Sequence, residues 1–337
     1  MSSFCENGKP GWIFHKPASG QIFSVMKSAI LEEVIACLPA DRTLFHYFKG
    51  QYAFFLLAHA ARLYPSVSAI KQSPFQSLLR QPDVKAVLAG QGDGVLRSSL
   101  LETVWKEGSL PFVLTVDRWG NHDQWQYQTT RKGCNLVLQL NFSEQHNRAY
   151  RRLVKPTDDY IFNFYGHPVM DREKRSLYRE TLAWARIDLD LDSGEALIEE
   201  IQSDWVRRVG ACLQNLRRRS SSWHLRWCEC DPEDFVAYAE KVLAPYDELW
   251  AEAMLAATLH FIRNELGIAE IFYHTHEAGQ RLKRVGGGAP PRSLYSDLPR
   301  KFCFQITKTD PAFIGRDRTF LRKKRSIKQV EWYRLVL

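Results

Sequence analysis

Features that would assign a chain to a membrane or secreted class are missing from this sequence of 337 residues. Its most apolar runs, Tyr52 to Leu63 and Leu249 to Ile262, are interrupted by His or Glu and are shorter than the roughly 20 apolar residues that span a bilayer. The stretch from Met1 to Gln21 lacks the continuous apolar core of a signal peptide. We therefore expect no membrane span and no membrane partner.

The seven cysteines, an odd number without even spacing, do not have the pattern of a disulfide framework. They indicate reduced thiols and a cytoplasmic location. Cys228 and Cys230 are separated by one residue and have no distant matching pair, which argues against a zinc knuckle. The sequence also lacks a Gly-rich phosphate loop, a Ser nucleophile elbow, a His-Glu-x-x-His pattern and an internal repeat.

The composition is that of a folded protein, with 45% hydrophobic, 25% charged and 12% aromatic residues. A net charge of +8 favours a polyanionic partner such as nucleic acid or a phosphorylated cofactor. Two arginine-rich runs, Arg207 to Arg226 and Arg316 to Lys328, are candidates for phosphate contacts with nucleic acid. The alternative for such runs is a solvated face of a helix and loop.

Hydrophobic spacing predicts an α+β (mixed α/β) fold, with a mostly antiparallel sheet packed with helices. We expect a helical N-terminal region over 1–110, a mixed α/β catalytic domain over 111–315 and a basic C-terminal segment over 316–337. The predicted helices of the first region are Ile30 to Leu38, Leu44 to Leu63, Pro74 to Leu79 and Pro82 to Leu88.

Three strands are predicted after Pro111: Phe112 to Asp117, Gln124 to Thr129 and Asn135 to Phe142. Amide side chains recur at alternate positions of the last two, so they share a face of the sheet. That face is either a groove for a polar substrate or an outer surface in water. The segment from Tyr150 to Arg179 reads as an irregular crossover. The amides of the predicted groove are Gln126, Gln128, Gln139 and Asn141.

A hairpin is predicted next, in which Ala183 to Leu191 is joined by the turn Asp192-Ser193-Gly194 to a strand that contains Glu199 to Trp205. Because side chains alternate along a strand, Glu200, Gln202 and Asp204 are expected on one face. On the other strand, Arg186, Asp188 and Asp190 share a face. These carboxylates are candidates for general base or metal chemistry, or are satisfied within the sheet by arginine or backbone partners.

Further along, an apolar stripe from Leu249 to Ile262 predicts a buried helix that ends at Gly267, and Ile268 to Thr275 predicts a buried strand. His274 and His276 are two apart on that strand, which makes them weak candidates for a metal site. Two histidines do not complete a ligand set, and the alternative is ordinary hydrogen bonding. Tyr295 to Pro299 and a strand from Phe302 to Thr307 follow.

The segment Ala196 to Trp205, with its Glu-Ile-Gln-Ser-Asp-Trp core, resembles a motif of the polyvalent proteins of bacteriophages and conjugative elements. The resemblance covers roughly residues 178 to 310 and implies a protein of mobile-element or conflict-system type. It places Thr and Gly where this chain has His274 and His276, which weakens a metal site there, and it retains Glu277. The catalytic candidates are therefore Glu200, Gln202, Asp204 and Glu277.

The order of hairpin, Arg-rich segment, helix, strand and Tyr295 is similar to that of acetyltransferases of the GNAT fold. This resemblance implies acetyl-CoA or another acyl-CoA as cofactor and Glu200 as the base that deprotonates an amine. In those enzymes, backbone amides at a helix start bind the pyrophosphate. The residues implied in cofactor binding are Arg207, Arg208, Gly210 and Tyr295.

The same hairpin also resembles nucleases of the PD-(D/E)XK type, with Asp188 or Asp190 followed by Glu200-Ile201-Gln202. There the two carboxylates would hold Mg²⁺, which activates water for attack on a phosphodiester. Gln202 stands in place of the usual Lys. A third possibility is a nucleic-acid-binding module without catalytic activity, in which the carboxylates are structural. An acyltransferase agrees best with the order of elements.

Overall fold

The computed structural model describes residues 28–38, 43–64, 66–90, 94–120, 128–172, 178–218, 225–283, 291–327 and 329–337. Its centre is a sheet of eight strands in the order β1-β2-β3-β4-β5-β6-β8-β7, in which every neighbouring pair is antiparallel except β5 and β6. The strands are β1 (Thr43–Tyr47), β2 (Leu110–Trp119), β3 (Asn135–Phe142), β4 (Thr181–Asp190), β5 (Glu195–Gln202), β6 (Glu270–His274), β7 (Gln305–Thr307) and β8 (Trp332–Val336).

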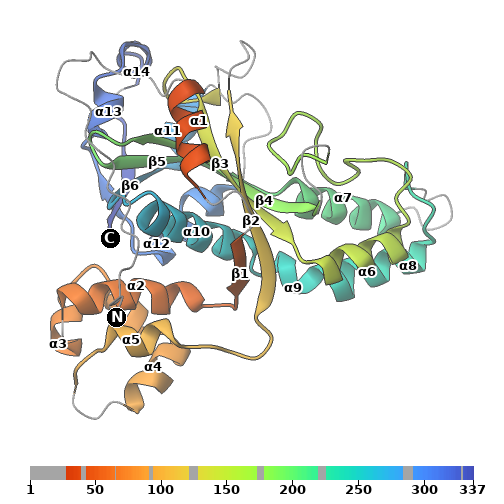
Figure 1. Ribbon diagram of the computed structural model, residues 1–337, viewed down its shortest axis with the longest axis horizontal. Helices are drawn as coiled ribbons and strands as arrows, with labels where there is room; N and C mark the ends of the chain where they lie inside the picture. Colours follow the sequence, from red (N-terminus) through yellow and green to blue (C-terminus); the bar gives the residue numbers. More distant parts are fainter. Residues whose placement is uncertain are drawn as a thin grey trace, which may run out of the picture.

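In Figure 1, helices α2 to α5 form one group, α6 to α9 a second, and α11, α13 and α14 a third, while α10 lies at the centre with α12 beside it. The α+β prediction is confirmed. The helices are α1 (Ser28–Cys37), α2 (Gln51–Leu63), α3 (Val67–Ile70), η1 (Gln76–Arg80), α4 (Pro82–Ala89), α5 (Ser98–Glu102), α6 (Glu144–Val154), α7 (Asp204–Arg218), α8 (Pro232–Ala237), η3 (Tyr238–Leu243), α9 (Ala244–Asp247), α10 (Trp250–His260), η4 (Phe261–Glu265), α11 (His276–Lys283), η5 (Arg292–Tyr295), α12 (Asp297–Lys301), α13 (Ala312–Gly315) and α14 (Arg318–Lys324).

One face of the sheet, called the apolar face here, carries the main hydrophobic core. Alternate residues of the central strands, such as Ala185 of β4 and Ile201 of β5, are fully buried on this face. Helix α10 packs against β3, β4 and β5 and contributes Leu255. The predicted apolar stripe is therefore core, and the helical run ends at Gly267 with φ of +69°, as its sequence indicates.

The opposite face, called the polar face here, is covered by two separate layers. Near β5, β6 and β8, helices α11, α13 and α14 pack on a small apolar cluster around Phe272 and Trp332. Near β3, the segment that contains Pro168 lies over the strand. Gln139 of β3 donates a hydrogen bond to the Pro168 carbonyl. Charged side chains of β4 and β5 lie between these layers.

A β-bulge in β5 decides which side chains reach the polar face. Ile198 pairs with Ile187 and Glu200 pairs with Arg186, so two steps along β5 match one step along β4. Glu199 is the extra residue. Both Glu199 and Glu200 therefore reach groups of the polar face, whereas strict alternation would turn one of the two towards the apolar core.

Several predicted elements differ from the structure, among them the strand predicted over Phe302 to Thr307, of which only Gln305–Thr307 forms β7. Residues Leu44 to Tyr47 form β1, paired with β2, and the helix starts only at Gln51, because Gly50 takes a φ of +91° between them. The helix prediction for this part is wrong. Strand β5 ends at Gln202, and Asp204 opens α7 behind Ser203, whose Oγ accepts the Val206 amide at 3.2 Å.

The sheet also draws on both ends of the described chain. Strand β1 comes from within the first 110 residues, and β8 comes from the last 22 and pairs with β6 and β7.

Of the strand predicted over Gln124 to Thr129, residues 124–127 lie outside the described part, and Thr129 lies in a bend. Among the described residues, no helix has the length and apolar character needed to cross a bilayer.

Candidate functional site

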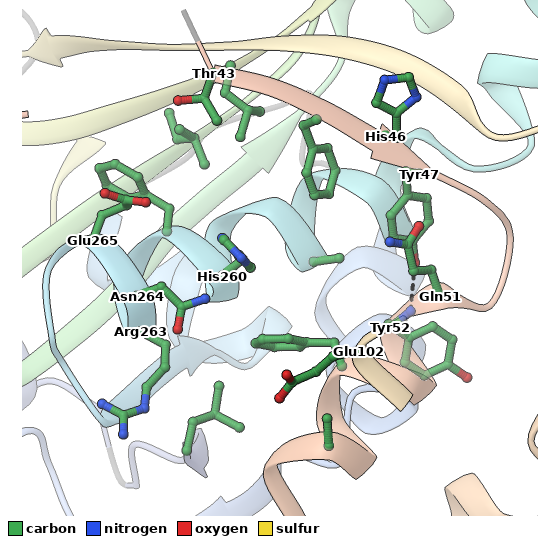
Figure 2. Close-up of a pocket in the computed structure, with 18 of the residues that line it drawn as sticks. Thr43, His46, Tyr47, Gln51, Tyr52, Glu102, His260, Arg263, Asn264 and Glu265 are labelled. Carbon is green, nitrogen blue, oxygen red and sulfur yellow. Dashed lines mark hydrogen bonds between the residues drawn. The ribbon is translucent and has the colours of Figure 1, made fainter. Parts of the chain in front are cut away.

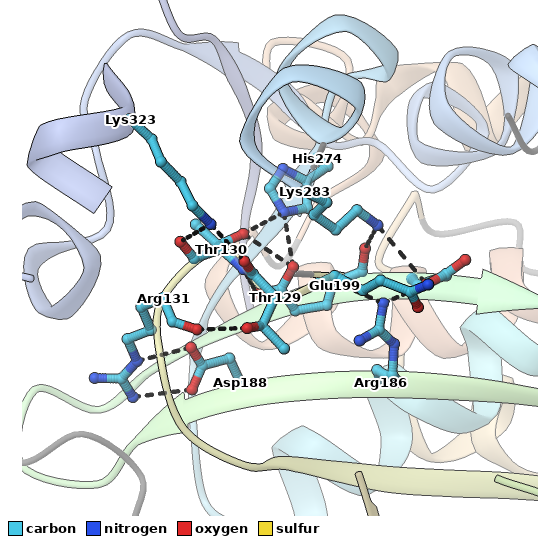
Figure 3. A network of polar contacts seen from close by, with 11 residues as sticks. Thr129, Thr130, Arg131, Arg186, Asp188, Glu199, His274, Lys283 and Lys323 are labelled. Carbon is cyan, nitrogen blue, oxygen red and sulfur yellow. Dashed lines mark hydrogen bonds and ion pairs between the residues drawn. The ribbon is translucent and has the colours of Figure 1, made fainter. Parts of the chain in front are cut away.

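Seven charged or titratable side chains form a buried network on the polar face (Figure 3). Arg131 and Asp188 form its first part, joined by two hydrogen bonds of 2.7 and 2.9 Å, and both side chains are sealed from solvent. Burial raises the pKa of Asp188 to about 6, against the attraction of Arg131. The buried charge network consists of Arg131, Arg186, Asp188, Glu199, Glu200, His274 and Lys283.

Glu199 is the most fully satisfied member of the network. Its carboxylate accepts the Thr130 amide at 2.8 Å and the Thr130 hydroxyl at 2.9 Å, and His274 Nε2 lies 3.1 Å away. Burial opposes its ionisation, but the hydrogen bond and charge of His274, together with Lys283, lower its pKa to about 2. Burial lowers the pKa of His274, and the hydrogen bond and charge of Glu199 oppose this shift.

Glu200 is held between two cations. Arg186 Nη2 donates to its carboxylate, and Lys283 Nζ lies 3.9 Å from Oε2 and donates to the Glu199 carbonyl at 2.7 Å. Burial favours the neutral acid, but Lys283 and Arg186 lower the pKa of Glu200 below its usual value. A carboxylate held in this way is a weak base, so the geometry does not favour Glu200 as the group that deprotonates an amine.

A second arrangement lies beside the network, where β5 ends. His167 Nδ1 is 2.6 Å from Asp204 Oδ2, and Gln202 Nε2 donates to Asp204 Oδ1 at 2.6 Å. Arg207 donates to the same Oδ1 at 2.7 Å. The Asp204 side chain is fully buried at the start of α7, where the helix dipole also favours its negative charge.

This arrangement orients the imidazole. Because a carboxylate only accepts hydrogen bonds, His167 donates through Nδ1, and its Nε2 is left as the basic nitrogen. The ring is 26% exposed and stands edge-on to two indoles, Trp119 and Trp184, at centroid distances of 6.3 and 5.7 Å. A buried carboxylate that orients a half-exposed histidine is an arrangement suited to general base catalysis.

Arg208 fixes the segment that carries His167. Its guanidinium donates to the carbonyls of Tyr160, Ile161 and Asn163 at 3.2, 2.8 and 2.8 Å, and it lies 3.7 Å from the centroid of the Phe164 ring. Its role in the structure is to hold this segment against α7. Gly210 lies inside α7, where helical amides bond to the carbonyls four residues earlier, so this stretch does not form an open anion-binding loop.

The other sequence candidates are spread over the structure. Tyr295 is buried, and its hydroxyl has no hydrogen-bond partner among the described residues; its ring lies 5.6 Å from Lys283 Nζ. Glu277 is 76% exposed on α11, 3.9 Å from Arg292, and does not join Glu200. The strand ends at His274, and His276 belongs to α11, so the prediction that these two histidines share a strand face is wrong.

The amides expected in a groove are structural where they are described. Gln139 and Asn141 are fully buried and bonded to one another through Thr115, whose hydroxyl donates to Gln139 at 2.5 Å and accepts from Asn141 at 2.8 Å. They line no groove. Gln128 is exposed, and its carbonyl accepts from Arg186, while Gln126 lies outside the described residues.

Metal chemistry finds little support in this part of the molecule. Asp188 is taken up by Arg131, and Glu200 by Arg186 and Lys283. Across the described ranges, no group of three or more His, Cys, Asp or Glu side chains is arranged to hold a metal ion. A cavity of about 870 Å³ lies elsewhere, on the apolar face next to β1 and α2 (Figure 2).

Three residues that matter most here carry no signal that sequence patterns detect. His167 lies 37 residues before Asp204 in an irregular segment, Lys283 lies at the end of α11, and Glu199 shares a face with Glu200 only because of the bulge. By contrast, the structure gives a role to residues of the Glu-Ile-Gln-Ser-Asp-Trp core, in hydrogen bonds and in the hydrophobic core. Its Trp205 is a core anchor whose indole donates to Tyr238 at 2.6 Å.

Comparison of the chain with protein-family models, with curated proteins and with solved structures gave no match.

Proposed function

We propose that this protein is an acyl-CoA-dependent acyltransferase of GNAT-like architecture, in which His167, oriented by Asp204, is the general base. The observation that carries the proposal is the His167–Asp204 pair at the carboxyl end of β5, with its buried carboxylate, its 2.6 Å contact and a histidine side chain that is 26% exposed. Glu200 has a different role in this proposal, as the counter-ion of Arg186 and Lys283.

The single parallel pair of strands supports a ligand site at the same edge. Strands β5 and β6 pair only as far as Ile198 and Tyr273, whereas β5 continues beside β4 to Gln202. Beyond Ile198, the backbone of β5 on the side of β6 is therefore not paired with β6. Helices α7 and α11 start directly after the two strands, and helix starts at the carboxyl ends of neighbouring parallel strands favour anionic groups.

The side chains in this gap fit a thioester ligand. Lys283 Nζ occupies it now, bonded to the Glu199 carbonyl, so an acyl-CoA chain lying along β5 would replace that hydrogen bond. Burial raises the pKa of Tyr295 well above its ordinary value, which keeps its hydroxyl protonated as a donor for a leaving thiolate. His167 Nε2 would take the proton of an amine as its nitrogen attacks the thioester carbon and the C–S bond breaks.

A non-catalytic nucleic-acid-binding module is the second candidate. Arg316, Arg318, Arg322 and Arg325 are exposed around α14, and among the described residues none of them is in an ion pair, so they present a phosphate-binding surface. The nuclease alternative has no such support, because its two carboxylates are already neutralised by arginine and lysine.

Thermal denaturation with and without acyl-CoA tests the proposal. Acetyl-CoA at about 100 times its Kd should raise the melting temperature by several degrees, since binding would stabilise the folded state by about 2.7 kcal/mol. Free CoA is the control for the nucleotide part, and longer acyl-CoA thioesters extend the series. No shift with any acyl-CoA would remove the proposal. If no acyl-CoA shifts the melting temperature, and the protein binds nucleic acid without cutting it in the presence of Mg²⁺, the nucleic-acid-binding module is the remaining candidate.

A further inference from the structure

A cavity with a volume of about 870 Å³ lies on the apolar face, opposite to His167. It is enclosed by β1, α2, α5, β2, α10 and η4 (Figure 2). Its volume falls within the range of small-molecule sites, roughly 300 to 1,000 Å³. None of the residues of the His167–Asp204 pair or of the buried charge network lines it, so any ligand it takes is separate from the acyl-transfer site.

The lining of this cavity has both apolar and polar parts. Aromatic rings of β1, α2 and η4 and the side chains of Leu114 and Leu138 of the sheet form the apolar part. Two small residues, Ala58 of α2 and Ala256 of α10, leave the space open between the helices. An apolar wall of this extent favours a hydrocarbon or aromatic group over water. The phenylalanine and tyrosine residues of the lining are Phe45, Tyr47, Tyr52, Phe54, Phe55 and Phe261.

Polar groups lie at the side formed by the end of α10 and by η4. In Figure 2, His260 points into the cavity, and Arg263 and Asn264 lie next to it. Arg62 is already engaged by Glu102 at 2.5 Å, whereas no ion pair within the described residues involves Arg263. Burial and the charges of Arg263 and Arg62 lower the pKa of His59, another lining residue, so a positive field reaches this side of the cavity.

A negative charge lies on the same helical turn. Glu265 also lines the cavity, and it raises the pKa of His260 against the larger lowering effect of burial. The charge of Glu265 therefore acts on His260. Arg263 lies on the other side of Asn264. A ligand carboxylate placed at Arg263 would meet a guanidinium that lacks a counter-ion, which is the stronger attraction in a partly apolar site.

We propose that this cavity binds an amphipathic monocarboxylate, with its apolar chain between Phe45 and Ala256 and its carboxylate at Arg263. The chemistry is that of a medium-chain fatty acid or an aryl-alkanoic acid. The site does not depend on the proposed acyl transfer. It would hold its ligand in a protein that transfers no acyl group.

Calorimetric titration with three probes of equal chain length, decanoate, decanol and decylammonium, tests the head group. Decanoate should bind most tightly, decanol more weakly and decylammonium weakest of all. The variant Arg263→Gln should weaken decanoate binding about tenfold and leave decanol unchanged. Arg281→Gln, which changes an exposed arginine of α11, is the matched control and should bind all three probes as the wild type does.

The variant Ala58→Phe should abolish binding of decanoate and decanol, because the added ring fills the cavity. If that variant does not fold, as judged by circular dichroism, Ala256→Leu replaces it and should weaken both probes. The proposal is overturned if the wild type binds none of the probes, if decylammonium binds as tightly as decanoate, or if Arg263→Gln leaves decanoate binding unchanged. Loss of acyl-CoA binding in the separate thermal assay would not affect these outcomes.

Discussion

The two faces of the sheet bury their side chains in different ways. On the apolar face, Ile198, Ile201 and Leu255 need only shape and volume to fit. On the polar face, Arg131, Asp188 and their neighbours are as deeply buried, and each charge needs a partner of opposite sign or a hydrogen bond. The difference shows that the packing of the polar face depends on ion pairs and hydrogen bonds between particular residues. The stability of this face therefore depends on matched charges and on pH.

The largest effect is expected from splitting a buried pair. Arg131→Met should lower the free energy of unfolding by about 3–5 kcal/mol, because Asp188 stays buried without its counter-ion. The double variant with Asp188→Leu should recover most of that loss. Urea denaturation of the single and double variants measures both. A single variant within about 1 kcal/mol of the wild type would mean that solvent reaches Asp188.

The apolar face should lose stability through cavity formation instead. Leu255→Ala should cost about 2–5 kcal/mol, because it removes a fully buried side chain of α10 from the main core. Since no charge is involved, the loss should be the same at pH 4 and pH 8. Urea denaturation at the two pH values measures this, and a clear difference in the loss would contradict the separation of the two faces.

Acid should weaken the polar face. The pKa of Glu199 is about 2 in the folded protein, below its ordinary value of 4.5, so its ionised form stabilises the fold above pH 4.5. This contribution, roughly 3 kcal/mol, is lost as pH falls from about 4.5 to 2. Denaturation at a series of pH values should show the fall in the wild type. In Glu199→Gln that part of the fall should be missing, and an unchanged pH dependence would contradict the assignment.

The smallest effect is expected at the exposed edge of the polar face. Glu277→Gln removes the partner of Arg292 at 3.9 Å, but both side chains are more than 70% exposed. The free energy of unfolding should change by less than about 1 kcal/mol, and acyl transfer should proceed at the wild-type rate. A large loss of activity with intact stability would return Glu277 to the catalytic candidates.

Local patterns predicted much of the fold. Strand β3 spans Asn135–Phe142 as its alternation indicates, helix α4 begins at Pro82, and the β4–β5 hairpin turns at Gly194 with φ of +67°. These elements depend on neighbours in sequence. The prediction that Leu44 to Leu63 is one helix fails, because β1 is a strand through its pairing with β2, a contact between residues far apart in the chain.

The candidate site was predicted only in part, for the same reason. The prediction that Glu200, Gln202 and Asp204 share one strand face fails at Asp204, which opens α7, although Gln202 and Asp204 share a hydrogen bond. The partners that set their chemistry come from distant segments. His167 and Lys283 carry no periodicity that points to Asp204 or Glu200, and the bulge at Glu199 follows from the register of β4 against β5.

The release of CoA from acetyl-CoA, in the presence of a mixture of primary amines such as a lysine peptide, a polyamine and an aminosugar, tests the central claim most directly. The wild type should release CoA, His167→Gln should lower the rate by about 10²- to 10⁴-fold with an unchanged melting temperature, and Glu200→Gln should retain more activity than His167→Gln. Equal rates in the wild type and His167→Gln, with activity lost in Glu200→Gln, would contradict the assignment of His167 as the base.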